Sequence, residues 1–395
     1  MKLLPVVRLV WEMIETLFAV VGFYSIGNEG YNRHRIRWLS SSHRERGRTM
    51  NISSFKYILA ASVLTALAAC GGGGSGGGDT SSSPGTVSLG LSDAPVGDLS
   101  EVVITIDGIE LRRKDGDDCD DETESDDCAY IDQFTDAGDV VDTVQVDLLK
   151  LQGSDNKIIV EEIELEAGEY DQLRLSVIDE DTNFSWVKEK ATGDTLKLLK
   201  VPSDELKLGG FTVDSGGVQV FIIEFNLHKA MTYNPGPDRY ILKPRGVRVV
   251  DVETAASISG KVDSALFDGN GTSPCNGKAN FDVGNVIYLY QGHGLDVVNL
   301  ADNFDSDVDG SAPATAIAPY ASEIVVAEDD GTYTYEIAYL APGNYTLAFT
   351  CEAEEDDSEI LDGFAIPSPD TQIIELNIAE GDSRVCDLPL VSGSC

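Results

Sequence analysis

Short β-rich runs, rather than helical stretches, dominate the sequence after residue 85. In the segment 102–106, Val102, Ile104 and Ile106 alternate with other residues, so their side chains share one face of an extended strand. Gly, Asp and Asn interrupt the runs, and no segment has the apolar period of a long, capped helix. Further runs lie at 144–148, 157–165, 172–177, 218–227 and 240–252. The pattern predicts an all-β fold built from two antiparallel β-sandwich domains.

The two β domains are expected to follow one another along the chain. We place the first at residues 86–253 and the second at 254–395, because 395 residues is long for a single domain. The second begins with the alternating segment 257–262, includes the apolar run 286–290 and contains a hairpin-like unit at 331–350.

One turn sequence occurs in both predicted domains. Residues 165–170 read Leu-Glu-Ala-Gly-Glu-Tyr, and residues 340–345 read Leu-Ala-Pro-Gly-Asn-Tyr. Gly supplies the backbone freedom that a tight turn needs, and we expect the Tyr to begin the next strand by packing over the turn. The similarity indicates either two distantly related domains or convergence on one convenient turn.

A secretory signal precedes the β domains. After Met50 the chain carries one positive charge, at Lys56, followed by the apolar run 57–67. This run is too short to span a bilayer, which needs about 20 apolar residues. It ends in Leu-Ala-Ala-Cys at residues 67–70, and the Gly/Ser-rich segment that follows is typical of a flexible tether.

The tetrapeptide at 67–70 resembles the lipobox of bacterial lipoproteins. The resemblance implies that residues 50–69 are a signal peptide, that Cys70 is lipidated with palmitate or similar acyl chains, and that residues 70–85 link it to the first domain. Because residue 71 is Gly and not the Asp of inner-membrane retention, the resemblance implies the outer membrane of a Gram-negative bacterium, on its periplasmic or cell-surface face. Residues 1–49 fit no part of this signal, so we interpret them as an over-called start before Met50, with a membrane-active leader as the alternative.

Four segments of the first predicted domain, 87–95, 102–111, 165–175 and 240–250, form a recognisable set of motifs. In these segments the domain resembles the bacterial lipoprotein family called domain of unknown function 4382. The family has no established activity, so the resemblance implies a location more than a chemistry. The second predicted domain resembles the carboxypeptidase-regulatory and prealbumin-like β-sandwiches, which are non-enzymatic modules.

The charge of the chain limits its partners. Lys and Arg number 28 and Asp and Glu number 68, which gives a formal net charge of -40. Such a surface repels nucleic acid and anionic lipid headgroups and attracts cations. Solubility in a salty medium, where screening acts over about 8–10 Å, is the simpler explanation of the charge.

The cysteines indicate disulfides in an exported protein. Once Cys70 is lipidated, six remain: Cys119, Cys128, Cys275, Cys351, Cys386 and Cys395. Cys119 and Cys128 flank one short loop, and the most local pairing of the last four joins Cys386 to Cys395. Those four allow three pairings, and the sequence does not choose among them. A zinc site is the competing interpretation, but no Cys-x-x-Cys motif is present.

Two acidic loops are candidate calcium sites, because calcium prefers six to eight oxygen ligands. The first contains Asp115, Asp117, Asp118 and Asp120, and the second contains Asp305, Asp307 and Asp309. The second matches the first half of an EF-hand loop, with Gly310 at the turn, but Ala316 stands where the bidentate Glu belongs. Solvated acidic loops are the alternative for both. No motif for an organic cofactor is present, so Ca²⁺ is the candidate ion.

Catalytic motifs are scarce. A Ser-His-Asp triad needs a histidine, and the only histidines after Cys70 are His228, at the end of a predicted strand, and His293, in a Gly-His-Gly loop. The Gly-x-Ser-x-Gly pattern at 73–77 lies in the tether, and no phosphate-binding loop or dinucleotide fingerprint occurs. We therefore predict no enzymatic activity.

The sequence predicts a membrane-anchored envelope lipoprotein that binds a polysaccharide or another envelope protein. One alternative is an acidic structural spacer without a specific ligand. Another is a hydrolase with an unrecognised site, which requires a cleft where His228 or His293 meets a carboxylate. Trp186, the only tryptophan after Cys70, lies beside Phe184 and distinguishes the first two hypotheses. A position on a sheet edge or loop tip favours carbohydrate stacking, and a core position favours the spacer.

Overall fold

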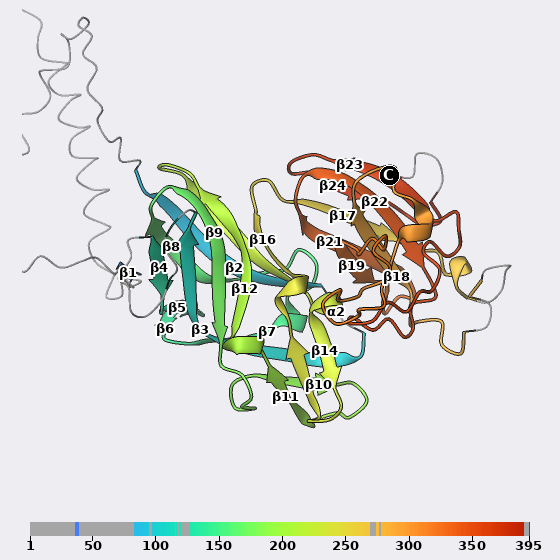
Figure 1. Ribbon diagram of the computed structural model, residues 1–395, viewed down its shortest axis with the longest axis horizontal. Coiled ribbons are helices and arrows are strands. Elements are labelled where there is room, and N and C mark those ends of the chain that lie inside the picture. The colour runs from blue at the N-terminus through green and yellow to red at the C-terminus, as the bar shows by residue number, and fades with distance from the viewer. Residues whose placement is uncertain are drawn as a thin grey trace, which may run out of the picture.

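The described parts of the chain consist of β-strands, short helical turns and loops (Figure 1). The computed structural model describes residues 36–38, 83–94, 97–114, 116, 119, 127–268, 274–275, 278–390 and 395. Within these residues no helix has the length and apolar character needed to cross a membrane. The helix α2 (Leu227–Ala230) is a single turn. The all-β fold predicted from the sequence is confirmed.

Two facing sheets form a first β-sandwich, whose main core cluster draws on residues between Val87 and Leu242. The larger sheet contains β1 (Ile36–Trp38), β3 (Leu99–Arg113), β4 (Cys128–Ile131), β7 (Val144–Asp147), β9 (Gly168–Val177), β10 (Trp186–Glu189), β11 (Leu196–Lys200), β12 (Glu205–Val213), β14 (Met231–Asn234) and β15 (Arg239–Leu242). The smaller sheet contains β2 (Gly85–Ala94), β8 (Lys157–Leu165), β13 (Val218–Asn226) and β16 (Val247–Asp251). A separate short pair contains β5 (Phe134–Asp136) and β6 (Asp139–Val141).

Strand β3 organises the larger sheet. Its first half pairs with β7 and β10, and its second half pairs with β4 and β9. Val102, Ile104 and Ile106 are fully buried on the core side, as their spacing predicted. The register with β9 shifts between Ile106 and Gly108, and this irregularity returns Ile109 and Leu111 to the core.

The second β-sandwich has its main core between Ala256 and Leu388. One sheet contains β17 (Ala256–Lys261), β20 (Val326–Ala327), β21 (Tyr333–Leu340) and β24 (Ser383–Val385). The other contains β18 (Val286–Gln291), β19 (Ala321–Ile324), β22 (Gly343–Thr350) and β23 (Ile373–Ile378).

Antiparallel pairing predominates, but three pairs of strands are parallel. These pairs are β2–β13, β11–β15 and β17–β24. Parallel neighbours need a crossover connection, and the chain between β2 and β13 supplies one by passing through the larger sheet. Strand periodicity is the same for both directions, so the sequence did not reveal these pairs. The predicted strand at 240–252 is also two strands, β15 and β16, separated by a 3-10 turn at Pro244–Gly246.

The two similar turns occupy equivalent places in the two sandwiches. Each connects strands of opposite sheets, β8 to β9 and β21 to β22, so the predicted hairpin at 331–350 is wrong. Alternating residues suit a sheet-crossing turn as well as a hairpin, which explains the error. The hydroxyl of Tyr170 donates to the carbonyl of Glu166 at 3.1 Å, and that of Tyr345 donates to the carbonyl of Ala341 at 2.7 Å. Both rings are buried, as expected of residues that pack over the turn.

Three disulfides are present. They join Cys119 to Cys128, Cys275 to Cys351 and Cys386 to Cys395, with Cα–Cα distances of 5.8, 6.0 and 4.4 Å. This is the most local of the pairings that the sequence left open. The Cys119–Cys128 and Cys386–Cys395 bridges each have a sequence separation of 9 residues, whereas Cys275–Cys351 has one of 76 and joins Cys275 to the residue that follows β22.

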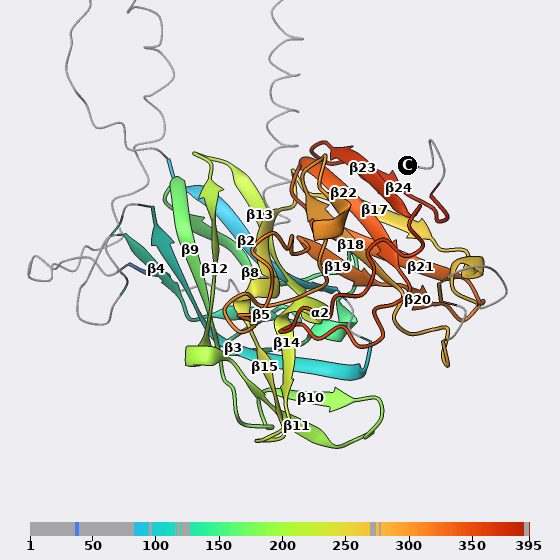
Figure 2. The ribbon, with the colours of Figure 1, turned by 45° about the vertical axis from the view of Figure 1, so that its right-hand side comes forward.

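The second sandwich packs against the smaller sheet of the first, so the two form one continuous body (Figure 2). Ile222 and Val250 from the first sandwich form a buried cluster with Ala338 and Tyr339 from the second. Strand β13 is therefore buried on both faces, with Phe221 among the residues that face its own core. Burial of both faces explains the uninterrupted apolar run of β13.

Candidate functional site

A four-strand lobe of the larger sheet carries several partly exposed aromatic residues. Strands β10, β11, β15 and β14 lie side by side at the lower end of the first sandwich (Figure 1). Val187 on β10 points into the core, so its neighbour Trp186 occupies the opposite, outer face. Trp186 is half-buried, and Phe184 in the preceding loop is 39% exposed.

Polar contacts hold Trp186 in place. Its indole N–H donates to Oε2 of Glu101 on β3 at 3.0 Å, and Nζ of Lys188 donates to Oε1 of the same carboxylate at 2.9 Å. These two hydrogen bonds, first that of Trp186 and then that of Lys188, lower the pKa of Glu101. Leu198 on β11 lies opposite Trp186 in the strand register. The result is a fixed aromatic ring with apolar and charged neighbours, which suits stacking against a flat ligand with a polar rim.

The opposite face of the same lobe carries a second aromatic pair. Tyr233 on β14 pairs in register with Tyr240 on β15, and their ring centroids lie 5.1 Å apart. Nζ of Lys197 lies 5.3 Å from the centroid of Tyr233, whose hydroxyl donates to Asp238 at 2.6 Å. Tyr233 is 42% exposed. The lobe thus presents aromatic rings on both faces.

A polar network joins the two sandwiches at the end of β13. Nδ2 of Asn226 donates to the carbonyl of Ser322 on β19 at 2.7 Å. Nδ1 of His228 on α2 lies 3.3 Å from Oγ of Ser322, and Nε2 lies 3.5 Å from Oδ2 of Asp356. Asn303 donates to both Oγ of Ser322 and Oδ2 of Asp356, at 3.1 and 2.9 Å. His228 therefore does meet a carboxylate, across the interface between the sandwiches.

This Ser-His-Asp arrangement does not form an open active site. Ser322 is 1% exposed, and the side chain of Asp356 is also 1% exposed. The two clefts described for this chain, one beside Gln152 and one beside Phe211, are lined by none of the three residues. A nucleophile needs room for a substrate carbonyl beside it, and the network instead satisfies polar groups within a packed interface.

Buried carboxylates form the second polar feature of this interface. Asp93, Glu224 and Glu323 are each at most 3% exposed. Nη2 of Arg248 lies 2.5 Å from Oε2 of Glu224, and the guanidinium also donates to the carbonyls of Ala338 and Tyr339 in the second sandwich. Burial raises the pKa of Glu224 to about 7 against the opposing effect of Arg248. Burial also raises the pKa of Asp93 and of Glu323 well above their ordinary values.

The sequence analysis missed these acids, although one signal was available. Glu224 is the single charged residue in the apolar strand β13, and it shares a strand face with Ile222, which packs against the second sandwich. A charge on an otherwise apolar strand indicates a partner from outside the sheet. Asp93 is likewise the single charged residue of β2, whereas Glu323 lies beside Ser322 in the four-residue strand β19, where no long apolar run marks it.

In the candidate calcium loop at 305–309, the carboxylates of Asp305 and Asp309 bond to other groups of the protein. Oδ2 of Asp305 lies 3.1 Å from Nζ of Lys243, and Asp307 donates its backbone N–H to Oδ1 of Asp305 at 3.1 Å. Asp309 accepts from the backbone and hydroxyl of Ser311 and from the backbone of residue 361. Among the described residues there is no group of three or more His, Cys, Asp or Glu side chains arranged to hold a metal ion.

Several predicted sites lie outside the described residues. They are the lipidation site Cys70 and the acidic loop residues Asp115, Asp117, Asp118 and Asp120. Lipidation of Cys70 and calcium binding in the loop that contains Asp115, Asp117, Asp118 and Asp120 therefore stay predictions. The remaining histidine, His293, lies in a loop where its Nε2 is 2.9 Å from the carbonyl of Leu376.

Fold and sites together define an all-β protein of two packed β-sandwiches with three disulfides. Residues 84–244 match the family described as "Domain of unknown function (DUF4382)". The first sandwich therefore contains a DUF4382 domain, as the sequence resemblance implied. Among curated protein sequences, none matches the chain.

Several solved structures of bacterial proteins show partial similarity to the chain. They include the TIE protein of Bacillus anthracis, the minor pilin GBS52 of Streptococcus agalactiae and the fimbrial anchor protein Mfa2 of Porphyromonas gingivalis. Sequence identities are 10%, 10% and 12%, and TM-scores are 0.16, 0.15 and 0.14. The alignments cover 78%, 76% and 69% of this chain and 34%, 94% and 80% of the other chains. The chain thus spans about a third of the TIE protein, and TM-scores this low carry no functional conclusion.

Proposed function

We propose that the chain is a lipid-anchored protein of the bacterial cell envelope that binds a polysaccharide and does not chemically change it. Cys70 carries the lipid, residues 71–85 form the tether, and the packed sandwiches present the binding surface. The lipobox resemblance and Gly71 support the outer membrane as the location. The net charge of -40 argues against nucleic acid as the partner.

The position of Trp186 is the observation that carries the binding function. A spacer without a ligand gains most stability by placing its largest aromatic side chain in the core. Trp186 instead lies on the outer face of β10, with its indole N–H bonded to Glu101 and with Phe184 nearby. Sugar rings combine an apolar C–H face with a rim of hydroxyl groups, and a fixed aromatic ring beside charged groups complements both.

The binding proposal is tested with purified full-length protein in detergent and a panel of envelope polysaccharides. We expect Trp186→Ala to weaken binding at least about tenfold, the loss of about 1.4 kcal/mol or more that is typical of an aromatic anchor. Tyr130→Ala is the matched control, because Tyr130 is a 42% exposed aromatic residue on the distant strand β4. Binding that is unchanged in Trp186→Ala, or lost equally in Tyr130→Ala, contradicts the proposal.

The anchor is tested in the same protein by growing producing cells with labelled palmitate. Label is expected in the wild-type chain and absent from Cys70→Ser, which is also expected to leave the membrane fraction. A labelled Cys70→Ser protein contradicts lipidation at this residue, whatever the outcome of the polysaccharide assay.

A structural spacer is the second candidate, and the contact between the sandwiches favours it. The cluster around Ile222 and Ala338 and the network around Asn226 and Ser322 join the sandwiches into one unit, which suits a stalk. Spacers of this kind need no ligand. Failure of the whole polysaccharide panel to bind, together with membrane attachment through Cys70, supports the spacer.

A further inference from the structure

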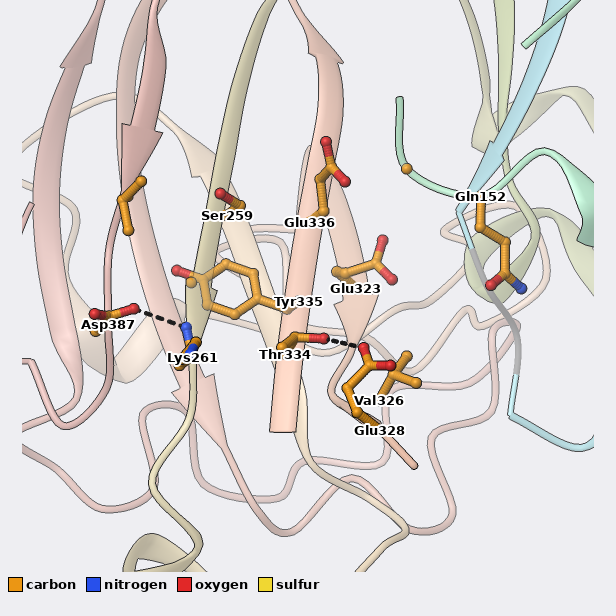
Figure 3. Close-up of a pocket in the computed structure, with 13 residues that line it drawn as sticks. Gln152, Ser259, Lys261, Glu323, Val326, Glu328, Thr334, Tyr335, Glu336 and Asp387 are labelled. Carbon is orange, nitrogen blue, oxygen red and sulfur yellow. Dashed lines mark hydrogen bonds between the residues drawn. The ribbon is translucent and has the colours of Figure 1, made fainter. Parts of the chain in front are cut away.

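An open cavity lies where the second sandwich meets a loop of the first (Figure 3). Its volume is about 570 Å³, within the size range of small-molecule sites. The first sandwich contributes Gln152 and Gly153, which follow the 3-10 turn Leu148–Lys150. The second contributes residues of strands β17, β19, β20, β21 and β24, together with Glu328 and Asp387, which follow β20 and β24.

Carboxylates dominate the charged groups of this cavity. The acidic lining residues are Glu323, Glu328, Glu336 and Asp387, and Lys261 is the one cation among the lining residues. Oε1 of Glu328 accepts a hydrogen bond from Thr334 at 2.6 Å, and Oδ1 of Asp387 accepts from the backbone of Lys261 at 2.8 Å (Figure 3). Within the described residues, no ion pair joins the ammonium of Lys261 to these carboxylates.

Glu323 differs from the other acids because it is buried and unpaired. It is 2% exposed, and its Oε2 has no hydrogen-bond partner in the described part of the chain. Its side chain extends from β19 toward the gap between the sandwiches, where Gln152 forms the opposite wall (Figure 3). The carboxylate of Glu336 lies beside Gly153 on the same side of the cavity. A Cβ atom added to Gly153 would lie 2.6 Å from Oε2 of Glu336. A buried carboxylate oxygen without a partner is costly, and the structure leaves it facing an open cavity.

We infer that this cavity binds a ligand bearing a primary ammonium group, with Glu323 as the principal acceptor and Glu336 beside it. An ammonium group donates three hydrogen bonds, and its positive charge balances the negative charge of the lining carboxylates. The inference goes beyond the proposed polysaccharide function, because the cavity and Trp186 lie in different parts of the molecule.

A metal ion fits this cavity less well. Among the described residues, Glu323 and its neighbours do not form a group of three or more ligating side chains around one point. Divalent cations with hard oxygen ligands need several carboxylate or carbonyl oxygens at about 2.0–2.6 Å from one centre. An organic ammonium needs one or two carboxylates and tolerates wider spacing.

Two kinds of ligand carry a primary ammonium group: free polyamines and the amino sugars of a polysaccharide. The experiment therefore has two arms. Full-length protein is titrated by calorimetry with putrescine and spermidine in one arm and with a glucosamine dimer in the other. 1,4-Butanediol and the N-acetylated dimer are the uncharged controls. Binding of the charged member of at least one pair is expected, and binding in one arm alone identifies the source.

Variants locate the site. Glu323→Gln keeps the shape of the side chain and is expected to weaken ammonium binding at least about tenfold. Glu380→Gln removes an exposed acid outside the cavity and is expected to change binding less than about twofold at the same ionic strength. Lys261→Gln removes the competing cation and is expected to strengthen binding. Equal losses in Glu323→Gln and Glu380→Gln indicate attraction by net charge alone and overturn the inference, as does the absence of ammonium binding to the wild-type protein.

Discussion

Replacing Arg248 by Met is expected to destabilise the protein in a strongly pH-dependent way. Arg248 lies between Glu224, its ion-pair partner, and the carbonyls of Ala338 and Tyr339 in the second sandwich. Its side chain is 15% exposed and that of Glu224 is 4% exposed, so solvent screens this pair little. The substitution removes two hydrogen bonds at any pH. It also removes a charge that stabilises the ionised forms of Glu224 and Glu323, so this part of the loss grows as the pH rises.

The magnitude follows from the pKa of Glu224. Burial raises the pKa to about 7 from the ordinary value of 4.5 even with Arg248 present, and without Arg248 it rises further. A raised pKa in the folded state means that the carboxyl contributes most stability below its unfolded pKa and that this stability is lost as the pH rises through about 7. Near pH 5 the variant therefore loses only the hydrogen bonds, about 1–3 kcal/mol. Near pH 9 the wild-type carboxyl is ionised, so the variant loses a further roughly 1.4 kcal/mol for each unit by which the pKa of Glu224 rises without Arg248.

Urea denaturation of wild-type and variant protein near pH 5 and near pH 9 measures this difference. Arg112→Met is the control, because Arg112 pairs with Asp171 on the surface, with side chains 22% and 35% exposed, and should lose less than about 1 kcal/mol at both pH values. Arg248→Lys retains the charge and should lose stability with little pH dependence. An Arg248→Met variant that loses the same free energy of unfolding at both pH values refutes the reasoning.

Two further predictions concern the turns and the disulfides. Tyr170→Phe and Tyr345→Phe should each cost about 1 kcal/mol of unfolding free energy, because each removes the hydroxyl-to-carbonyl hydrogen bond of a buried tyrosine. A loss in only one of the two variants would contradict the shared role of the turns. The double variant Cys275→Ser and Cys351→Ser, which opens a loop of 76 residues, should lose about 4 kcal/mol, against about 3 kcal/mol for Cys119→Ser and Cys128→Ser. Trp186 fluorescence reports the unfolding of the first sandwich, and circular dichroism reports the unfolding of the whole chain. In the Cys275 and Cys351 variant, a loss of stability seen only by Trp186 fluorescence would contradict the assignment of that bridge to the second sandwich.

Strand positions were predictable because burial imposes a two-residue period on each strand. The segments 102–106 and 286–290 lie within β3 and β18, where alternation or an apolar run marks the core. Pairing was less predictable, since β21 and β22 have the pattern of a hairpin but belong to opposite sheets. Alternation of apolar and polar residues indicates which face of a strand is buried. It does not indicate which strand is its neighbour in the sheet.

The candidate sites were predictable only where a single residue type carries the signal. Trp186 was identified as the only tryptophan after the tether, and the cysteines by their number and spacing. Glu323 was not identified, because its importance comes from Asp93 and Glu224, which lie far away in the sequence and meet it across the interface. A local sequence pattern does not predict long-range contacts of this kind.

The acids at the interface connect ligand binding to the association of the two sandwiches. Glu323 lines the cavity, and the charges of Asp93 and Glu224 act on it together with that of Arg248. A cation bound at Glu323 lowers the free energy of the ionised carboxylate, and the acids Asp93 and Glu224 that act on this carboxylate belong to the other sandwich. Binding must therefore stabilise the packed arrangement by the same free energy with which packing strengthens binding. The coupling is expected to grow as the pH rises, because only the ionised carboxylates attract the cation and oppose burial.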